Sequence, residues 1–122
     1  MKKILSILLL PVLALPARAE PVTEIHTRKD FCQAMLQGGA FNRYLEKTCG
    51  FKKGVSAKAS RIISSECRGV FDKRRTSVLE KEAVDDGIMR FKRYGKADFC
   101  KANRQGYLDA GEVLDKISRA RK

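Results

Sequence analysis

Apolar residues recur at helical spacing along four stretches of the chain, and polar residues fill the positions between them. A repeat of about three to four residues indicates amphipathic helices, because it places the apolar side chains on one face of each helix. No stretch alternates apolar and polar residues over six positions with enrichment in β-branched residues, so no strand is expected. The pattern therefore predicts an all-α protein.

The first predicted helix begins after Thr27, whose hydroxyl can cap it, and ends at Cys49, where Gly50 is a natural stop. Gly38 and Gly39 lie near its middle, and a pair of glycines costs up to about 2 kcal/mol of helix propensity. They either break this helix into two or lie on its inner face, where they allow close packing against a neighbour. The spacing of the apolar residues fits both alternatives.

Residues 50–55 are predicted to form a loop, after which Ser56 can cap a second helix. The apolar stripe of this helix extends as far as Phe71. The polar run at 72–75 is expected to end it. Because the loop at 50–55 is short, the first and second helices are expected to form an antiparallel hairpin.

A third helix is expected from the Thr-Ser pair at 76–77 to Gly95. Acidic residues fall in its first half and basic residues in its second half, as the helix dipole favours. The last helix begins at Lys96 or Asp98, and residues 118–122 form a short basic tail that is expected to fray. Because the connections are short, these elements predict a small disulfide-linked bundle of about four helices, mostly up-and-down.

The first 19 residues have the three parts of a secretory signal peptide. Two lysines follow Met1, residues 4–15 are largely apolar, and Ala17 and Ala19 stand at the positions that a signal peptidase reads. The apolar run of about 12 residues is too short for a membrane span, which needs roughly 20. We therefore expect residues 20–122 to form a single helical domain that is exported to the periplasm or secreted from a bacterial cell.

The predicted mature part contains four cysteines, at Cys32, Cys49, Cys67 and Cys100. An even number of cysteines in a small exported domain indicates two disulfides. The cysteines include no C-x-x-C pair, and His26 is the single histidine of the sequence. Neither a redox motif, nor a zinc site, nor a catalytic thiol is therefore expected.

The expected helical hairpin favours one of the three possible pairings. Cys32 and Cys67 would lie at the same level at its far end, while Cys49 would lie at the bend, close to Cys100. A straight helix separates Cys32 from Cys49 by about 25 Å, whereas a disulfide allows about 6 Å between Cα atoms. A bond between these two residues would require the first helix to turn at Gly38-Gly39.

Basic residues exceed acidic residues along the whole chain. Lys and Arg total 26 against 14 Asp and Glu, a net charge of +12, and removal of residues 1–19 leaves +9 (23 − 14). Such a charge steers a protein towards acidic partners. The candidate contact residues are Arg90, Arg93 and Lys96, which are three residues apart near the end of the third helix and can share one exposed flank.

Two other segments resemble parts of functional sites, one a calcium loop and the other a catalytic carboxylate, and neither match is complete. Residues 101–112 match part of an EF-hand calcium loop, but Lys101 stands where the loop needs an acidic first ligand. Glu66 is the acidic residue with an apolar neighbourhood, yet no second carboxylate, nucleophile or hydrolase motif accompanies it. We therefore expect no metal, no cofactor and no enzymatic activity.

These observations predict a small exported binding protein, of accessory, inhibitor or immunity type, that contacts an acidic protein surface. A protein that binds polyanions or lipid surfaces is the alternative, and an enzyme of unrecognised type is the third hypothesis. Nucleic acid is not expected as a partner in the cell. An apolar patch or groove would favour the first hypothesis, an anion site at Arg90, Arg93 and Lys96 the second, and a deep cleft at Glu66 the third.

Overall fold

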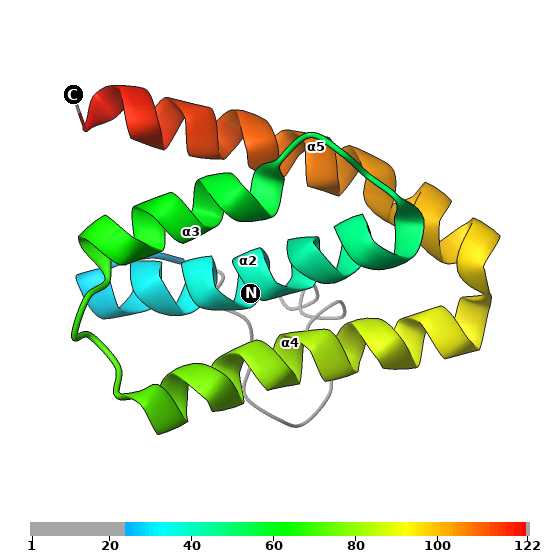
Figure 1. Cartoon of the computed structure of the whole chain (residues 1–122), viewed down its shortest axis with the longest axis horizontal. Helices are drawn as coiled ribbons and strands as arrows, with labels where there is room; N and C mark the ends of the chain where they lie inside the picture. Colours follow the sequence, from blue (N-terminus) through cyan, green and yellow to red (C-terminus); the bar gives the residue numbers. More distant parts are fainter. Residues whose placement is uncertain (1–23, 122) are drawn as a thin grey trace, which may run out of the picture.

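The computed structural model describes residues 24–121, and this part of the chain contains helices and no strand. The elements are α2 (Arg28–Cys49), α3 (Val55–Glu66), α4 (Lys73–Tyr94) and α5 (Lys96–Ala120) (Figure 1). The predicted all-α, disulfide-linked bundle is thus confirmed. The predicted signal peptide and its cleavage site lie outside the described residues. None of the described helices is long and apolar enough to span a membrane.

The helices alternate in direction, and α2 lies between its neighbours (Figure 1). α3 packs on one side of α2 and α4 on the other, so these two consecutive helices do not touch each other. The segment between them passes the beginning of α2, and α5 then returns along α3 and closes the bundle. The up-and-down order is as predicted. α2 contacts each of the other three helices, whereas α3 and α4 do not contact each other.

α2 is continuous through Gly38 and Gly39, so the alternative of a broken first helix is wrong. Its start is capped by Thr27, whose Oγ1 accepts a hydrogen bond of 3.0 Å from the backbone N–H of Asp30. A Cβ atom on Gly39 would lie 3.3 Å from the Cβ of Ala59 on α3. Gly39 therefore permits the close approach of α2 and α3, which confirms the second alternative for this residue, whereas a Cβ atom on Gly38 would meet nothing within 4 Å.

α4 needs a glycine for the same reason. A Cβ atom on Gly87 would lie 3.0 Å from Cδ2 of Tyr44 and 3.1 Å from Cε1 of Phe41, both on α2. The two rings also form edge-to-face contacts with Phe99 of α5, at centroid distances of 6.1 and 6.4 Å. The aromatic side chains of α2 thus fill the space between α4 and α5, and Gly87 gives them room.

Three predicted boundaries, at both ends of α3 and at the start of α4, differ from the observed ones. α3 begins at Val55, and its N-cap is Gly54 rather than Ser56. α3 ends at Glu66 rather than near Phe71, and Cys67 forms its C-cap. α4 begins at Lys73, because the carboxylate of Asp72 accepts a 2.7 Å hydrogen bond from the N–H of Arg75 and caps the helix. The polar run at 72–75 is therefore the cap and first turn of α4 rather than a loop before it.

α5 also extends further towards the C-terminus than predicted. The helix continues to Ala120, so residues 118–120 do not form a separate tail. Arg121 then binds back to α3, with its Nε 3.0 Å from Oε2 of Glu66. This ion pair ties Arg121, the last described residue, to α3.

Both disulfides have the pairing that the hairpin predicted. Cys32 is bonded to Cys67 and Cys49 to Cys100, with Cα–Cα distances of 5.5 and 5.6 Å. One bond fixes the beginning of α2 to the end of α3, and the other fixes the end of α2 to the beginning of α5. Each end of α2 is thereby bonded to a neighbouring helix. Both disulfides close long loops in the unfolded chain, which lowers its conformational entropy and so stabilises the fold.

Candidate functional site

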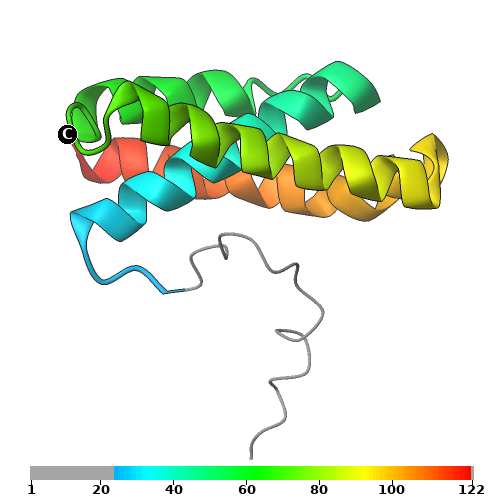
Figure 2. The same cartoon turned by 90° about the horizontal axis from the view of Figure 1, so that it is seen from below.

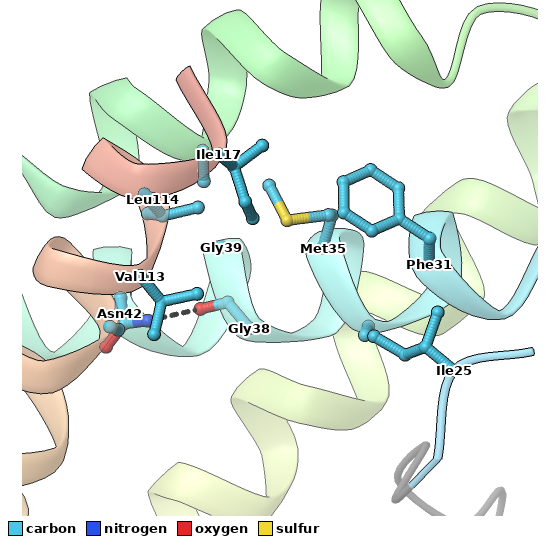
Figure 3. Close-up of a pocket in the computed structure, with 12 residues that line it drawn as sticks. Ile25, Phe31, Met35, Gly38, Gly39, Asn42, Val113, Leu114 and Ile117 are labelled. Atoms are coloured by element: carbon cyan, nitrogen blue, oxygen red, sulfur yellow. Dashed lines mark hydrogen bonds between the residues drawn. The ribbon is translucent and has the colours of Figure 1, made fainter. Parts of the chain in front are cut away.

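An apolar groove lies between the first half of α2 and the second half of α5 (Figure 3). α2 runs obliquely to α5, and its beginning extends beyond the layer of the other helices (Figure 2). The groove has a volume of about 210 Å³. It is lined by Ile25, Phe31, Ala34, Met35, Gly38, Gly39, Asn42, Ala59, Ala110, Val113, Leu114 and Ile117.

The groove is hollow because the helix that forms one wall lacks side chains there. Gly38 and Gly39 face it with hydrogen atoms only, and a Cβ atom on Gly38 would meet nothing within 4 Å. Met35 and Leu114 are buried and form its floor. The two glycines that weaken the propensity of the first helix are thus what leaves the groove open.

The single polar side chain of the lining, Asn42, is already engaged. Its Nδ2 donates a 2.8 Å hydrogen bond to the carbonyl oxygen of Gly38, within its own helix (Figure 3). The other lining residues are apolar or glycine, and none of the lining residues carries an ionisable group. The groove therefore offers apolar contact and no acid, base or nucleophile.

The edges of the groove are exposed apolar side chains. Val113 on α5 is 53% exposed, and Ile25, just before α2, is 56% exposed. These exposed side chains extend the apolar surface of the groove at its edges. Asp109 and Lys116 lie about one turn to either side of Val113 on the exposed part of α5, so the edge also carries charge of both signs.

The predicted cation cluster at Arg90, Arg93 and Lys96 is divided between two helices. α4 ends at Tyr94, so Lys96 belongs to α5. Arg90 forms an ion pair with Asp86, at 2.9 Å between Nε and Oδ2, and the guanidinium of Arg93 lies 6.0 Å from the centroid of the Tyr94 ring. All three cations are exposed. Their role in binding stays a prediction.

Glu66 and residues 101–112 have structural settings that do not match the chemistry considered for them. The Glu66 side chain is 45% exposed and paired with Arg121, so it is not a carboxyl group in an apolar pocket. Residues 101–112 lie entirely within α5, where a continuous helix replaces the loop that an EF-hand requires. Within residues 24–121, no group of three or more potential metal ligands comes together.

A buried polar network that the sequence did not indicate lies at the other end of the bundle. Tyr107 of α5 is 1% exposed, and its hydroxyl donates a 2.7 Å hydrogen bond to Oε2 of Glu46 on α2. The same hydroxyl accepts a 2.9 Å bond from the N–H of Lys53. Glu46 also accepts bonds from the N–H and the hydroxyl of Ser56 at the start of α3. The network joins three helices and the loop between two of them.

The network supplies the cap that α3 lacks. Its N-cap residue, Gly54, has no side chain to bind the free N–H groups of the first turn, and Glu46 takes that role from α2. Burial raises the pKa of Glu46, but the hydrogen bonds from Ser56 and Tyr107 outweigh this effect and hold the pKa below its ordinary value. Burial, together with the bond to Glu46, raises the pKa of Tyr107. These groups are occupied with one another, which indicates a structural role.

Comparison of the chain with protein-family models, with curated proteins and with solved structures gives no match. The function is therefore argued from the geometry of the described residues. An apolar groove is the feature that was expected to favour the first of the three hypotheses, a binding protein.

Proposed function

We propose that this protein is an exported binding module and that the apolar groove between α2 and α5 is its contact surface. The observation that carries the proposal is a groove with a lining of apolar side chains and glycines, bordered by the exposed side chains of Val113 and Ile25. Apolar area of this kind gains free energy when a partner covers it. Because no lining residue is ionisable, the groove supports binding rather than catalysis.

The occupant that fits this groove is an amphipathic helix of a partner protein. The groove lies between two helices and is apolar, and an apolar groove is what an amphipathic helix needs to bury its apolar stripe. Small residues such as Gly38 and Ala110 form part of its walls and leave room for the anchoring side chains of that helix.

The partner helix is proposed to carry acidic residues beside its apolar stripe. Residues 24–121 contain 22 Lys and Arg against 13 Asp and Glu, a net charge of +9 (22 − 13). A charge of this size raises the association rate with an acidic partner even where no single ion pair dominates. The groove would then supply the specific contact, and the surrounding charge would supply the attraction over distance.

The covalent framework supports a location outside the reducing cytoplasm. Both disulfides are formed, and free cysteines are absent from residues 24–121. Disulfides of this kind persist in oxidising compartments. Together with the predicted signal peptide, they support action in the periplasm or after secretion, as an accessory, inhibitor or immunity-type protein.

The test is a differential capture from periplasmic extract. Residues 20–122, oxidised and immobilised, are compared with the variants Val113→Asp at the groove and Val78→Asp on α4. Both valines are exposed, at 53% and 38%, so neither change should unfold the bundle. Quantitative mass spectrometry should find a protein that wild type and Val78→Asp retain and that Val113→Asp loses by about tenfold or more, since a carboxylate buried without a partner costs over 1 kcal/mol.

The result that would contradict the proposal is a set of captured proteins that the two variants retain equally. Such a result would mean that Val113 is not in the contact. Melting temperatures of both variants are measured alongside, so that loss of binding is not confused with loss of structure.

A further inference from the structure

A second hollow, polar rather than apolar, lies along the seam between α3 and α5. It has a volume of about 500 Å³ and shares no lining residue with the apolar groove. It is lined by Lys58, Arg61, Ser65, Asp115, Ser118 and Arg121. We refer to it as the α3–α5 cleft.

The lining residues come from one face of each helix. On α3 they are three and four residues apart; on α5 and its C-cap residue, Arg121, they are three residues apart, so each set follows one side of its helix. The two helices run in the same direction (Figure 1). Two rows of polar side chains therefore face each other along the cleft.

Ion pairs between the helices occupy both ends of the cleft. At one end, Nζ of Lys58 lies 2.9 Å from Oδ1 of Asp115. At the other end, Arg121 binds Glu66 through Nε at 3.0 Å, and its Nη2 donates to the hydroxyl of Ser65. These contacts hold the two rows at a fixed separation.

In the middle of the cleft, two polar groups have no partner among the described residues. Among the described residues, neither the guanidinium of Arg61 nor the hydroxyl of Ser118 forms a hydrogen bond or ion pair with another side chain or with the backbone. Both line the cleft, between the ion pairs at its ends. The cleft thus presents a planar cation and a hydroxyl donor toward the same space.

We infer that the α3–α5 cleft binds a phosphate monoester group. The lining has three cations and one carboxylate, a net charge of +2, and the neighbouring Glu66 leaves +1. The guanidinium of Arg61 can donate two parallel hydrogen bonds to a phosphate, and the Ser118 hydroxyl can donate a third. A phosphate has several acceptor oxygens for these donors, whereas a carboxylate has two.

The size of the cleft indicates more than a free phosphate ion. A hollow of about 500 Å³ lies within the range of small-molecule sites. The same phosphate chemistry can be presented by a soluble phosphorylated molecule or by the headgroup of phosphatidic acid. The inference rests on the cleft alone and does not depend on a partner protein in the apolar groove.

The test is a titration of the oxidised protein, residues 20–122, followed by amide resonances in NMR spectra. Sodium phosphate and glycerol 3-phosphate are added at constant ionic strength, with sodium sulfate and sodium acetate as competing anions. We expect saturable shifts at the amides of Arg61 and Ser118, with glycerol 3-phosphate bound more tightly than acetate.

The matched variants are Arg61→Gln in the cleft and Arg119→Gln on the exposed side of α5. Each removes one positive charge, and neither arginine has an ion-pair partner among the described residues. We expect Arg61→Gln to weaken binding by about tenfold or more, because a two-bond contact to the phosphate is lost, and Arg119→Gln to weaken it by about twofold at most. Ser118→Ala should also weaken binding, without a change in the melting temperature.

Vesicles distinguish the two sources of the phosphate. If the ligand is a lipid, vesicles containing phosphatidic acid should bind in a manner that Arg61→Gln reduces, while vesicles of phosphatidylglycerol, a phosphodiester, should bind less. If the ligand is soluble, glycerol 3-phosphate binds and both vesicles behave alike. The inference is overturned if no saturable shift occurs at Arg61 and Ser118, or if both arginine variants lose affinity equally, because the attraction would then be diffuse.

Discussion

Removal of one hydroxyl group, by the change Tyr107→Phe, should destabilise the bundle more than its small size suggests. The ring of Tyr107 is buried, and its hydroxyl is both a donor to Glu46 and the acceptor for the N–H of Lys53. Phenylalanine keeps the ring and its packing, so no large cavity forms. What is lost is the junction between α2, α5 and the loop before α3.

The magnitude follows from the two hydrogen bonds. A hydrogen bond to a charged group contributes about 1.5–3 kcal/mol, and a buried N–H left without a partner costs about 1–3 kcal/mol. The Lys53 N–H lies near the exposed loop, where water can replace part of its lost bond. We therefore expect Tyr107→Phe to lower the free energy of unfolding by about 2–3 kcal/mol.

The assay is urea unfolding of the oxidised protein at neutral pH, followed by far-UV circular dichroism. The matched control is Tyr94→Phe, because Tyr94 is 56% exposed and its hydroxyl forms no hydrogen bond with the described residues. The control should change the free energy of unfolding by less than about 0.5 kcal/mol. If Tyr107→Phe changed stability as little as the control does, the buried network would have no energetic role.

Three further predictions test the packing, the electrostatics and the processing of the chain. Gly87→Ala should lower stability by about 1–2 kcal/mol, because the new methyl group would crowd the aromatic rings of α2, whereas Gly106→Ala, with open space around it, should raise stability by about 0.5–1 kcal/mol; thermal unfolding measures both. The folded-state pKa of Glu46 is depressed, so its contribution is present above the unfolded-state pKa and is lost as the pH falls through the folded-state value. The stability difference between wild type and Glu46→Gln should therefore be large at neutral pH and should shrink in acid, and an equal difference at both would contradict the hydrogen-bonded carboxylate. Intact-mass analysis of the exported protein should find Glu20 as the first residue, and a retained Met1 would disprove the signal peptide.

The helices and the disulfide pairing could be predicted because both depend on regular geometry. The rise per residue of a helix fixes which cysteines lie at the same level, so Cys32 could reach Cys67 but not Cys49. Helix boundaries were less predictable where several residues could serve as the cap. Asp72 caps α4 in place of the Thr-Ser pair at 76–77, and nothing local to the sequence ranks these alternatives.

The groove and the buried network could not be predicted, because both depend on contacts between residues far apart in the chain. Glu46 and Tyr107 are separated by 61 positions. A signal for such a network did exist in Gly54, which leaves the start of α3 without a side-chain cap and so requires one from elsewhere. The groove depends on the oblique crossing of α2 and α5, which the apolar pattern of either helix does not contain.

Cross-linking in the cell can show whether a partner helix lies in the apolar groove. A photo-cross-linking amino acid replaces Val113 at the groove or, as the control, Val78 on α4, and the periplasm is irradiated. We expect one discrete adduct from position 113 and none from position 78, and the cross-linked peptide of the partner should belong to an amphipathic segment that carries acidic residues. Equal adducts from both positions, or no adduct from position 113 in a protein that is folded and exported, would contradict it.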